Sequence, residues 1–144
     1  IEQFIYSTPE DSRNQHDHLM EVTERIYQKL GLPYQIIAIV SSALNDNAAI
    51  KYDLEAWLPS QNCYRETHSC SNITDWQARR TNIRYRENAS GKVKFAHTLN
   101  NTGIATPRAL VMFIENHQNE DGSVNIPTKL QPYMGGMTKL IPQK

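Results

Sequence analysis

The feature that most restricts the fold of this sequence is a pair of strand-like segments joined by a very short connection. From Ile50 to Leu58, IKYDLEAWL, apolar and polar side chains partly alternate, as in a β-strand with one buried face. Residues 59–62, PSQN, provide a turn, and residues 64–72, YRETHSCSN, return as a second strand. A parallel arrangement needs a crossover of about a dozen residues or more, for which this connection is too short. The sequence therefore predicts an antiparallel sheet.

The returning segment is polar on both of its faces. In a regular strand, one face would carry Tyr64, Glu66, His68 and Cys70, and the other Arg65, Thr67, Ser69 and Ser71. A strand within a globular chain normally turns at least one apolar face to the core, so these side chains must serve another purpose. We hypothesise that the segment faces a ligand.

The N-terminal part of the chain predicts a strand, a long helix and a second strand. Residues 1–7, IEQFIYS, have strand character, and the helix is expected to begin with Thr8 as its cap and to end before Gly31. Apolar residues recur within it at helical spacing: Leu19, Val22, Ile26 and Leu30. Residues 34–40, YQIIAIV, are apolar and β-branched, and therefore predict a buried strand.

The second half of the chain continues the alternation of strands and helices. The expected elements are a helix turning into a strand at 75–85, a strand at 93–101, a helix at 106–118, a short helix at 126–133 and a loose tail at 134–144. Thr106 is the expected cap of the helix at 106–118, with Pro107 in its first position. Together the elements predict one α+β domain, an antiparallel β-sheet flanked by helices.

Composition narrows the range of partners and locations. The chain has 15 Lys plus Arg and 15 Asp plus Glu, and this balance argues against electrostatic nucleic-acid binding by this chain alone. Its apolar runs are too short to span a membrane, and Cys63 and Cys70 are not expected to form a disulfide, so a reducing, cytoplasmic location is expected. The chain opens on Ile1 within a strand-like stretch and not on Met, so we expect a piece of a longer protein.

Three charged residues are candidates for chemistry. Glu55 and Glu66 lie on paired strands, but Glu55 also fits a solvated strand position. Glu66 stands among hydroxyl side chains, the combination that Mg²⁺ and phosphate require. Arg108 falls in the first turn of the helix at 106–118, where the helix dipole disfavours a cation unless an anion compensates it. The alternative is an ordinary surface arginine.

The remaining polar candidates have plain alternatives. A zinc site would need His68, His97 and Cys70 to converge, and their spacing matches no common ligand pattern. Asn100 and Thr102 offer hydrogen bonds to a small ligand, although by default such residues serve a turn.

Several long blocks of the sequence, taken together, resemble seryl-tRNA synthetases. These blocks are YDLEAWLPSQNCYRETHSCSN, DWQARR, HTLNNTGIATPRALVMFIENHQNEDGSVNIP and LQPYMGG, which occur in order with the family's spacing. The resemblance implies a class II aminoacyl-tRNA synthetase core and an ATP-dependent, AMP-forming serine–tRNA ligase. Such an enzyme converts serine and ATP, with Mg²⁺, to seryl-adenylate and transfers the serine to tRNA-Ser or selenocysteine tRNA.

The resemblance also implies roles for individual residues. Glu2, Asn100 and Thr102 resemble serine-binding residues, with Thr102 near the substrate hydroxyl. Glu66, Thr67, His68 and Ser69 resemble the ATP segment, with Glu66 and Ser69 at Mg²⁺ and the phosphates. Arg108 resembles the motif 3 arginine that pairs with the γ-phosphate, and with Glu66 it is a candidate catalytic residue.

The resemblance covers only the C-terminal part of the family's catalytic domain, from the second motif 2 strand through motif 3. Motif 1, the motif 2 arginine and the tRNA-binding helical arm find no counterpart in residues 1–144. We therefore expect this chain alone to form no adenylate, and expect the parent protein to be a homodimer that binds tRNA-Ser through that arm. The alternatives are a non-catalytic synthetase-like protein that binds a partner or nucleotide, and an unrelated zinc protein.

Overall fold

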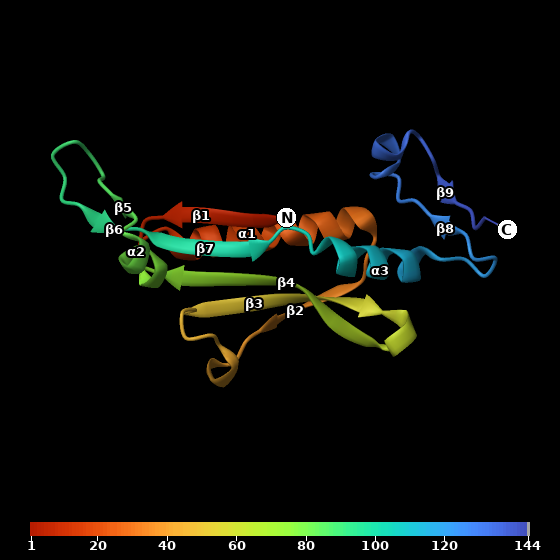
Figure 1. Ribbon diagram of the computed structural model, residues 1–144, viewed down its shortest axis with the longest axis horizontal. Coiled ribbons are helices and arrows are strands. Elements are labelled where there is room, and N and C mark those ends of the chain that lie inside the picture. Colours follow the sequence, from red (N-terminus) through yellow and green to blue (C-terminus); the bar gives the residue numbers. More distant parts are fainter. Residues whose placement is uncertain (144) are drawn as a thin grey trace.

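The computed structural model describes residues 1–143 and is built around one antiparallel sheet (Figure 1). Five strands pair in the order β1-β7-β4-β3-β2. Their bounds are Glu2–Ser7 for β1, Tyr34–Ala38 for β2, Ile50–Leu58 for β3, Cys63–Thr74 for β4 and His97–Thr102 for β7. The predicted α+β class with an antiparallel sheet is confirmed, because every neighbouring pair in this sheet is antiparallel.

The other elements lie around the sheet and beyond its ends. The helices are α1 (Ser12–Leu30), α2 (Trp76–Thr81) and α3 (Thr106–His117), with 3₁₀ turns η1 (Ser41–Ala43), η2 (Pro59–Gln61) and η3 (Gln131–Met134). Two short strand pairs join β5 (Arg84–Tyr85) to β6 (Lys94–Phe95) and β8 (Val124–Asn125) to β9 (Lys139–Leu140). The molecule is elongated, with α2 and β5–β6 at one end and α3 and β8–β9 at the other (Figure 1). No helix within residues 1–143 is long and apolar enough to cross a bilayer.

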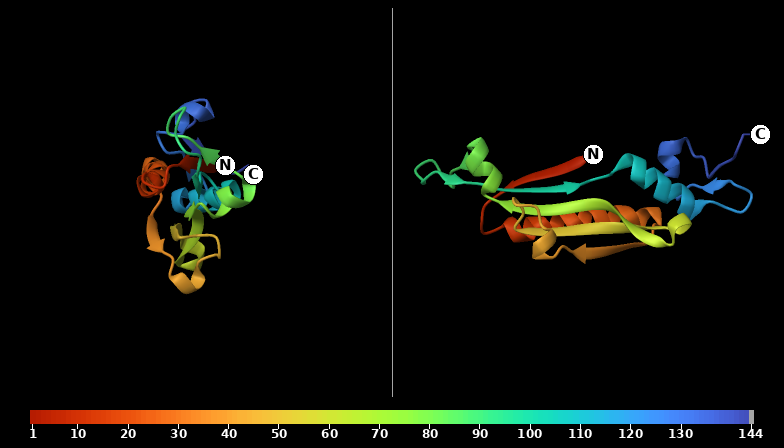
Figure 2. Two further views of the ribbon diagram at one scale, coloured as in Figure 1. Left: turned by 90° about the vertical axis from the view of Figure 1, so that its left-hand side faces the viewer. Right: turned by 60° about the horizontal axis from the view of Figure 1, so that its bottom comes forward.

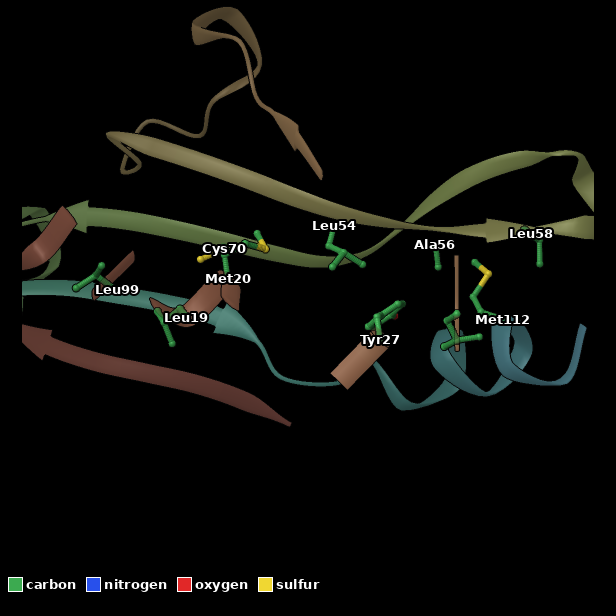
Figure 3. Close-up of a cluster of buried hydrophobic side chains, with 10 residues drawn as sticks. Leu19, Met20, Tyr27, Leu54, Ala56, Leu58, Cys70, Leu99 and Met112 are labelled. Carbon is green, nitrogen blue, oxygen red and sulfur yellow. The ribbon is translucent and has the colours of Figure 1, made fainter. Parts of the chain in front are cut away.

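The core lies between α1 and one face of the sheet, along which α1 runs lengthwise (Figure 2). Leu19, Met20 and Tyr27 of α1 pack against buried side chains of β3, β4 and β7, among them Leu54 and Leu99 (Figure 3). Met112 of α3 extends this cluster past the end of α1 (Figure 3). The β3 residues predicted to share a face, Tyr52, Leu54, Ala56 and Leu58, do so against this core.

Both long helices begin at a residue other than the one predicted from the sequence, α1 later and α3 one residue earlier. The N-cap of α1 is Asp11, and Thr8 instead accepts a hydrogen bond from the Asp11 N–H at 3.3 Å within a preceding turn. Thr106 is the first residue of α3, not its cap, and Ala105 precedes it. Gly31 ends α1 in the left-handed conformation at φ 67°, which favours glycine because it lacks a Cβ.

Two other expectations were wrong. The segment at 34–40 is not a buried strand, since β2 is the outermost strand of the sheet and Ile36 remains 39% exposed. An apolar run does not distinguish an edge strand from a central one. The tail is not loose between residues 134 and 143, because β9 pairs with β8 and Ile126 N–H donates to Thr138 O at 2.9 Å; Lys144 lies outside the described residues.

A β-bulge in β4 changes which of its side chains share a face. Leu54 pairs with His68 and Glu55 pairs with Glu66, so Thr67 is an extra residue without a partner in β3. The predicted alternation of Glu66 with His68 and Cys70 on one face is therefore wrong. His68 and Cys70 lie on the core face, whereas Glu66 lies on the opposite face with Ser69.

Candidate active site

The candidate site lies on the face of the sheet turned away from α1, which we call the open face. Leu54 is fully buried in the core, so its neighbours Asp53 and Glu55 point to the open face. Their cross-strand partners are Ser69 and Glu66, which share that face. The bulge thus brings together two predicted Mg²⁺ residues that regular alternation would have separated.

The strand β7 contributes two further residues to the open face. The Asn101 side chain turns to α1, where its amide donates to Leu19 O at 2.9 Å and Thr23 Oγ1 at 2.7 Å. Its neighbours Asn100 and Thr102 therefore point to the open face.

Register then places the predicted serine-binding residues side by side. Thr102 lies directly opposite Glu2 of β1, and Asn100 lies between Phe4 of β1 and Ser71 of β4. Cβ atoms of such directly opposed residues are about 5 Å apart, close enough for both side chains to touch one small ligand. Ser71 was not among the site residues predicted from the sequence. It follows Ser69 by two residues, and residues two apart in a strand share a face, so it could have been included.

Six polar side chains of the open face have no side-chain partner in the described part of the chain. Within residues 1–143, no side-chain hydrogen bond or ion pair is made by Glu2, Glu66, Ser69, Ser71, Asn100 or Thr102. On the core face the opposite holds, because Thr67, Asn72 and Asn101 all bond to neighbouring backbone. Groups without internal partners are free to bind a ligand.

Arg108 reaches β4 from the first turn of α3. Its Nη1 donates to the backbone oxygen of Glu66 at 2.9 Å, so two of the predicted triphosphate residues are adjacent. Both line an exposed cleft of about 590 Å³, together with Glu55, Tyr64 and Arg65. The other guanidinium N–H groups of Arg108 can donate to an anion in this cleft.

Thr67 and His68 are the two predicted ATP residues that the structure places elsewhere. Thr67 is 2% exposed, and its hydroxyl lies 3.2 Å from Leu54 O. His68 is fully buried, with its ring 5.0 Å from that of Tyr27. Neither side chain reaches the open face, so the predicted ATP segment presents only Glu66 and Ser69 of its four side chains there. The bulge is the cause, since it turns both inward.

The open face also carries an acidic residue that the sequence reasoning missed. Asp53 is buried beside Ser69, and its Oδ1 lies 3.5 Å from Lys51 Nζ on the same strand. Its position next to Leu54 in the alternating segment could have indicated that Asp53 faces away from the core. Asp53 and Lys51 thus form an ion pair next to Ser69.

The histidines and cysteines do not form a metal centre in the described chain. Among residues 1–143, no three His, Cys, Asp or Glu side chains are grouped as metal ligands. Burial raises the pKa of the Cys70 thiol to about 12, so it remains protonated and packs as an apolar group. His97 is occupied by the Ser12 hydroxyl at 3.0 Å. Cys63 and Cys70 are both free, as expected.

The antiparallel sheet, the helix behind it and the unpaired polar side chains in front of it correspond to one class of domain. The family described as tRNA synthetase class II core domain (G, H, P, S and T) matches residues 1–117, so the chain belongs to this family. This confirms the class II core inferred from the sequence.

Within that family, the relatives are seryl-tRNA synthetases. The serine--tRNA ligase of Methanosphaera stadtmanae is 62% identical over 138 residues, which are 96% of this chain and 32% of that protein. The crystal structure of seryl-tRNA synthetase from Pyrococcus horikoshii complexed with ATP matches with a TM-score of 0.95 and 48% identity, covering 99% of this chain and 32% of that one.

A second solved structure agrees. The cytoplasmic serine-tRNA ligase from Naegleria fowleri in complex with AMP matches with a TM-score of 0.91 and 45% identity, over 100% of this chain and 34% of that one. The resemblance to seryl-tRNA synthetases is therefore confirmed. The chain spans about a third of the length of the relatives it matches.

Proposed function

We propose that this chain contributes the serine and nucleotide subsites of a serine–tRNA ligase. The ligase would activate serine with ATP and then transfer the seryl group to tRNA-Ser or selenocysteine tRNA. The observation that carries the proposal is the set of open-face side chains without protein partners, arranged next to Arg108 in a chain 62% identical to a serine--tRNA ligase. Two of the related structures are described as complexes with ATP and AMP.

The serine subsite is assigned to the paired ends of β1 and β7. The Glu2 carboxylate suits the ammonium group of serine, and the Thr102 and Asn100 side chains suit its hydroxyl and carboxylate. A site that hydrogen-bonds the substrate hydroxyl discriminates strongly against alanine, because the analogue leaves the site's polar groups unpaired.

The nucleotide subsite is assigned to the middle of β4 and the start of α3. Arg108 is assigned to the γ-phosphate, and the Glu66 carboxylate and Ser69 hydroxyl to Mg²⁺. One carboxylate and one hydroxyl on the same face fit Mg²⁺, which keeps phosphate and water oxygens as its other ligands. The ion would neutralise charge on the phosphates.

The chemical step requires positioning and charge stabilisation, with no protein nucleophile. A carboxylate oxygen of serine attacks the α-phosphorus, the bond to the bridging oxygen breaks, and pyrophosphate leaves with that electron pair. Glu2 and Thr102 hold the attacking serine, while Arg108 balances charge on the departing phosphates. These roles are consistent with a sheet that presents both subsites on one rigid surface.

Serine-dependent exchange of pyrophosphate into ATP tests this function. We would measure it in a chimera in which this chain replaces the matching part of the Methanosphaera stadtmanae enzyme. Exchange with serine, and less than about 1% of that rate with alanine, is expected from the hydroxyl contacts. Equal exchange with both amino acids, or none with either, would rule the proposal out. The 144-residue chain by itself is expected to give no exchange, since it spans a third of its relatives.

The alternative is a synthetase-like protein that binds a nucleotide or partner without catalysis. Calorimetric titration with ATP distinguishes this alternative from the ligase. It compares the ATP affinity of the same chimera with that of its Arg108→Ala variant. The ligase assignment predicts that ATP affinity falls by about tenfold or more, because a charged hydrogen-bonding group is lost. Unchanged affinity would contradict the role of Arg108. Lys139→Ala, at a basic residue in β9 that does not line the cleft, is the control.

Three broader features belong to this proposal. Residues 1–144 would be the C-terminal part of the catalytic domain, from β1 as the second motif 2 strand through motif 3, to which Arg108 of α3 would belong. The parent enzyme would be a homodimer that holds tRNA-Ser through a helical arm outside this chain. It would act in the cytoplasm, the location given for the related enzyme of Naegleria fowleri.

A further inference from the structure

His68 lies behind the proposed active site and hydrogen-bonds to two separate segments. Its Nε2 is 3.2 Å from the backbone oxygen of Gly103, which follows β7. Its Nδ1 is 3.0 Å from Thr67 Oγ1, within the bulge of β4. The ring is fully buried and stands edge-on to the ring of Tyr27. One imidazole thus joins the end of one central strand to the middle of its neighbour.

The protonation of His68 follows from these partners. A carbonyl oxygen can only accept, so Nε2 carries a proton that it donates to Gly103 O. In the neutral ring with Nε2 protonated, Nδ1 accepts from the Thr67 hydroxyl, whose one proton is shared with Leu54 O at 3.2 Å. The contacts therefore run from β3 through Thr67 and His68 to Gly103.

The Gly103 end of this chain of bonds leads to the serine subsite. Gly103 N–H and Ile104 N–H both donate to the backbone oxygen of Ile1, at 2.9 Å and 3.2 Å. These bonds hold the start of β1 against the end of β7, where Glu2 lies opposite Thr102. A shift of Gly103 would therefore move the two residues assigned to serine.

The Thr67 end leads to the nucleotide subsite. Thr67 directly follows Glu66, whose backbone oxygen accepts the bond from Arg108 at 2.9 Å. Thr67 has no pairing residue in β3, so its hydroxyl contacts to Leu54 O and to His68 restrain the conformation of the bulge. A change at Thr67 would therefore displace the Glu66 backbone and the guanidinium bound to it.

We propose that His68 is a positioning residue that fixes the serine subsite relative to the nucleotide subsite, an inference that rests on the proposed function. It touches neither substrate. Its two bonds hold the loop after β7 and the bulge of β4 at a constant separation, so that the serine carboxylate meets the α-phosphate in line. Because the reaction rate depends strongly on the distance between the reacting groups, loss of this restraint should impair the reaction.

The variant His68→Phe tests the proposal, because it keeps the buried volume and removes both hydrogen bonds. In the exchange assay with the chimera, we expect KM to rise for both serine and ATP by about tenfold, the effect of one buried hydrogen bond. His68→Gln should restore both values to within about threefold, since its amide can donate to Gly103 O and accept from Thr67.

His16→Phe is the matched control. His16 is equally buried and also bonds a backbone oxygen, that of Cys70 at 3.1 Å, but contacts neither Gly103 nor Thr67. A purely structural role for His68 predicts that both Phe variants lose stability and that their KM values stay unchanged. That result would overturn the proposal. If His68→Phe does not fold, Thr67→Val removes the same link, and an unchanged KM for ATP would then overturn it.

Hydrogen exchange on the 144-residue chain separates failure of this inference from failure of the proposed function. His68→Phe should accelerate exchange of the Gly103 and Ile104 amides by about tenfold or more, whereas His16→Phe should not. If the chimera shows no serine-dependent exchange, the function fails, and the amide exchange still decides the role of His68 in the fold. Equal protection of both amides in all three proteins would overturn the restraint itself.

Discussion

At the scale of single residues, the face on which a polar side chain lies decides its role. His68 and Asn101 point to α1 and use their hydrogen bonds to hold backbone in place. Ser69 and Asn100, one position away along the same strands, point to the open face and make no side-chain bonds within residues 1–143. Residues of similar chemistry therefore serve the fold or the site according to strand alternation and one bulge.

The two fully buried histidines predict how stability depends on pH. Burial is the main cause that lowers the pKa of both His16 and His68 below the ordinary value. The unfolded state therefore takes up protons first as pH falls, and stability that is present above about pH 6.5 is lost below it. We expect the unfolding free energy to fall by up to about 1.4 kcal/mol per pH unit for each histidine.

Urea denaturation of the chain between pH 7.5 and pH 5 measures this dependence. His68→Gln and His16→Gln should each reduce the slope of unfolding free energy against pH, by up to the value for one proton, since glutamine does not titrate. His18→Gln, at an exposed position, is the control for the exchange of an imidazole for an amide. Carboxylates titrate below this window and do not obscure it. A slope that is the same in all four proteins would contradict the prediction.

At the scale of elements, the β4 bulge explains how a strand with polar residues on both sides fits a globular fold. Before the bulge, the strand presents Tyr64 and Glu66 to the open face. After it, Cys70 and Asn72 face α1, where the Asn72 amide donates to Ser12 O at 3.2 Å. The extra residue corrects the alternation midway, so a sequence that is polar on both faces gives one core face and one ligand face.

Deletion of single residues in β4 tests this account. Without Thr67, Glu66 and His68 become neighbours that already face opposite sides, so the deletion should cost roughly 1–3 kcal/mol of unfolding free energy. Without Ser69, one half of the strand must turn to the wrong face, and we expect a loss above about 4 kcal/mol or no folded protein. Denaturation followed by circular dichroism compares the two, and similar losses would refute the bulge as the cause.

At the scale of the whole molecule, the sheet ends in two strands that each have one unpaired edge. These are β1 and β2. On β1, Phe4 and Tyr6 are 47% and 61% exposed and lie edge to face, with ring centroids 5.2 Å apart. An unpaired edge with exposed aromatic side chains favours pairing with another chain.

We therefore expect the 144-residue chain to self-associate as its concentration rises. Replacing both aromatic residues, Phe4→Lys with Tyr6→Lys, should shift the chain towards monomer, because lysine on an edge strand opposes pairing. Sedimentation velocity over a range of concentrations measures this. The control Leu110→Lys changes an equally exposed apolar residue on α3, away from any sheet edge, and should leave association unchanged. If both changes reduced self-association equally, the cause would be the added positive charge and not the unpaired edge of β1, and the prediction would be wrong.

The sequence by itself determined the two long helices, the main strands of the sheet, the antiparallel pairing of β3 with β4, and the family. These depend on local signals: alternation, a turn too short for a crossover, and blocks of residues in order. It also predicted most residues of the proposed site, including Glu2, Glu66, Thr102 and Arg108. Tertiary structure alone decided that Thr67 and His68 face the core, that β2 is an edge, and that β9 returns to β8. The physical reason is that a bulge, an edge position and a distant pairing are set by neighbouring strands, which local periodicity does not register.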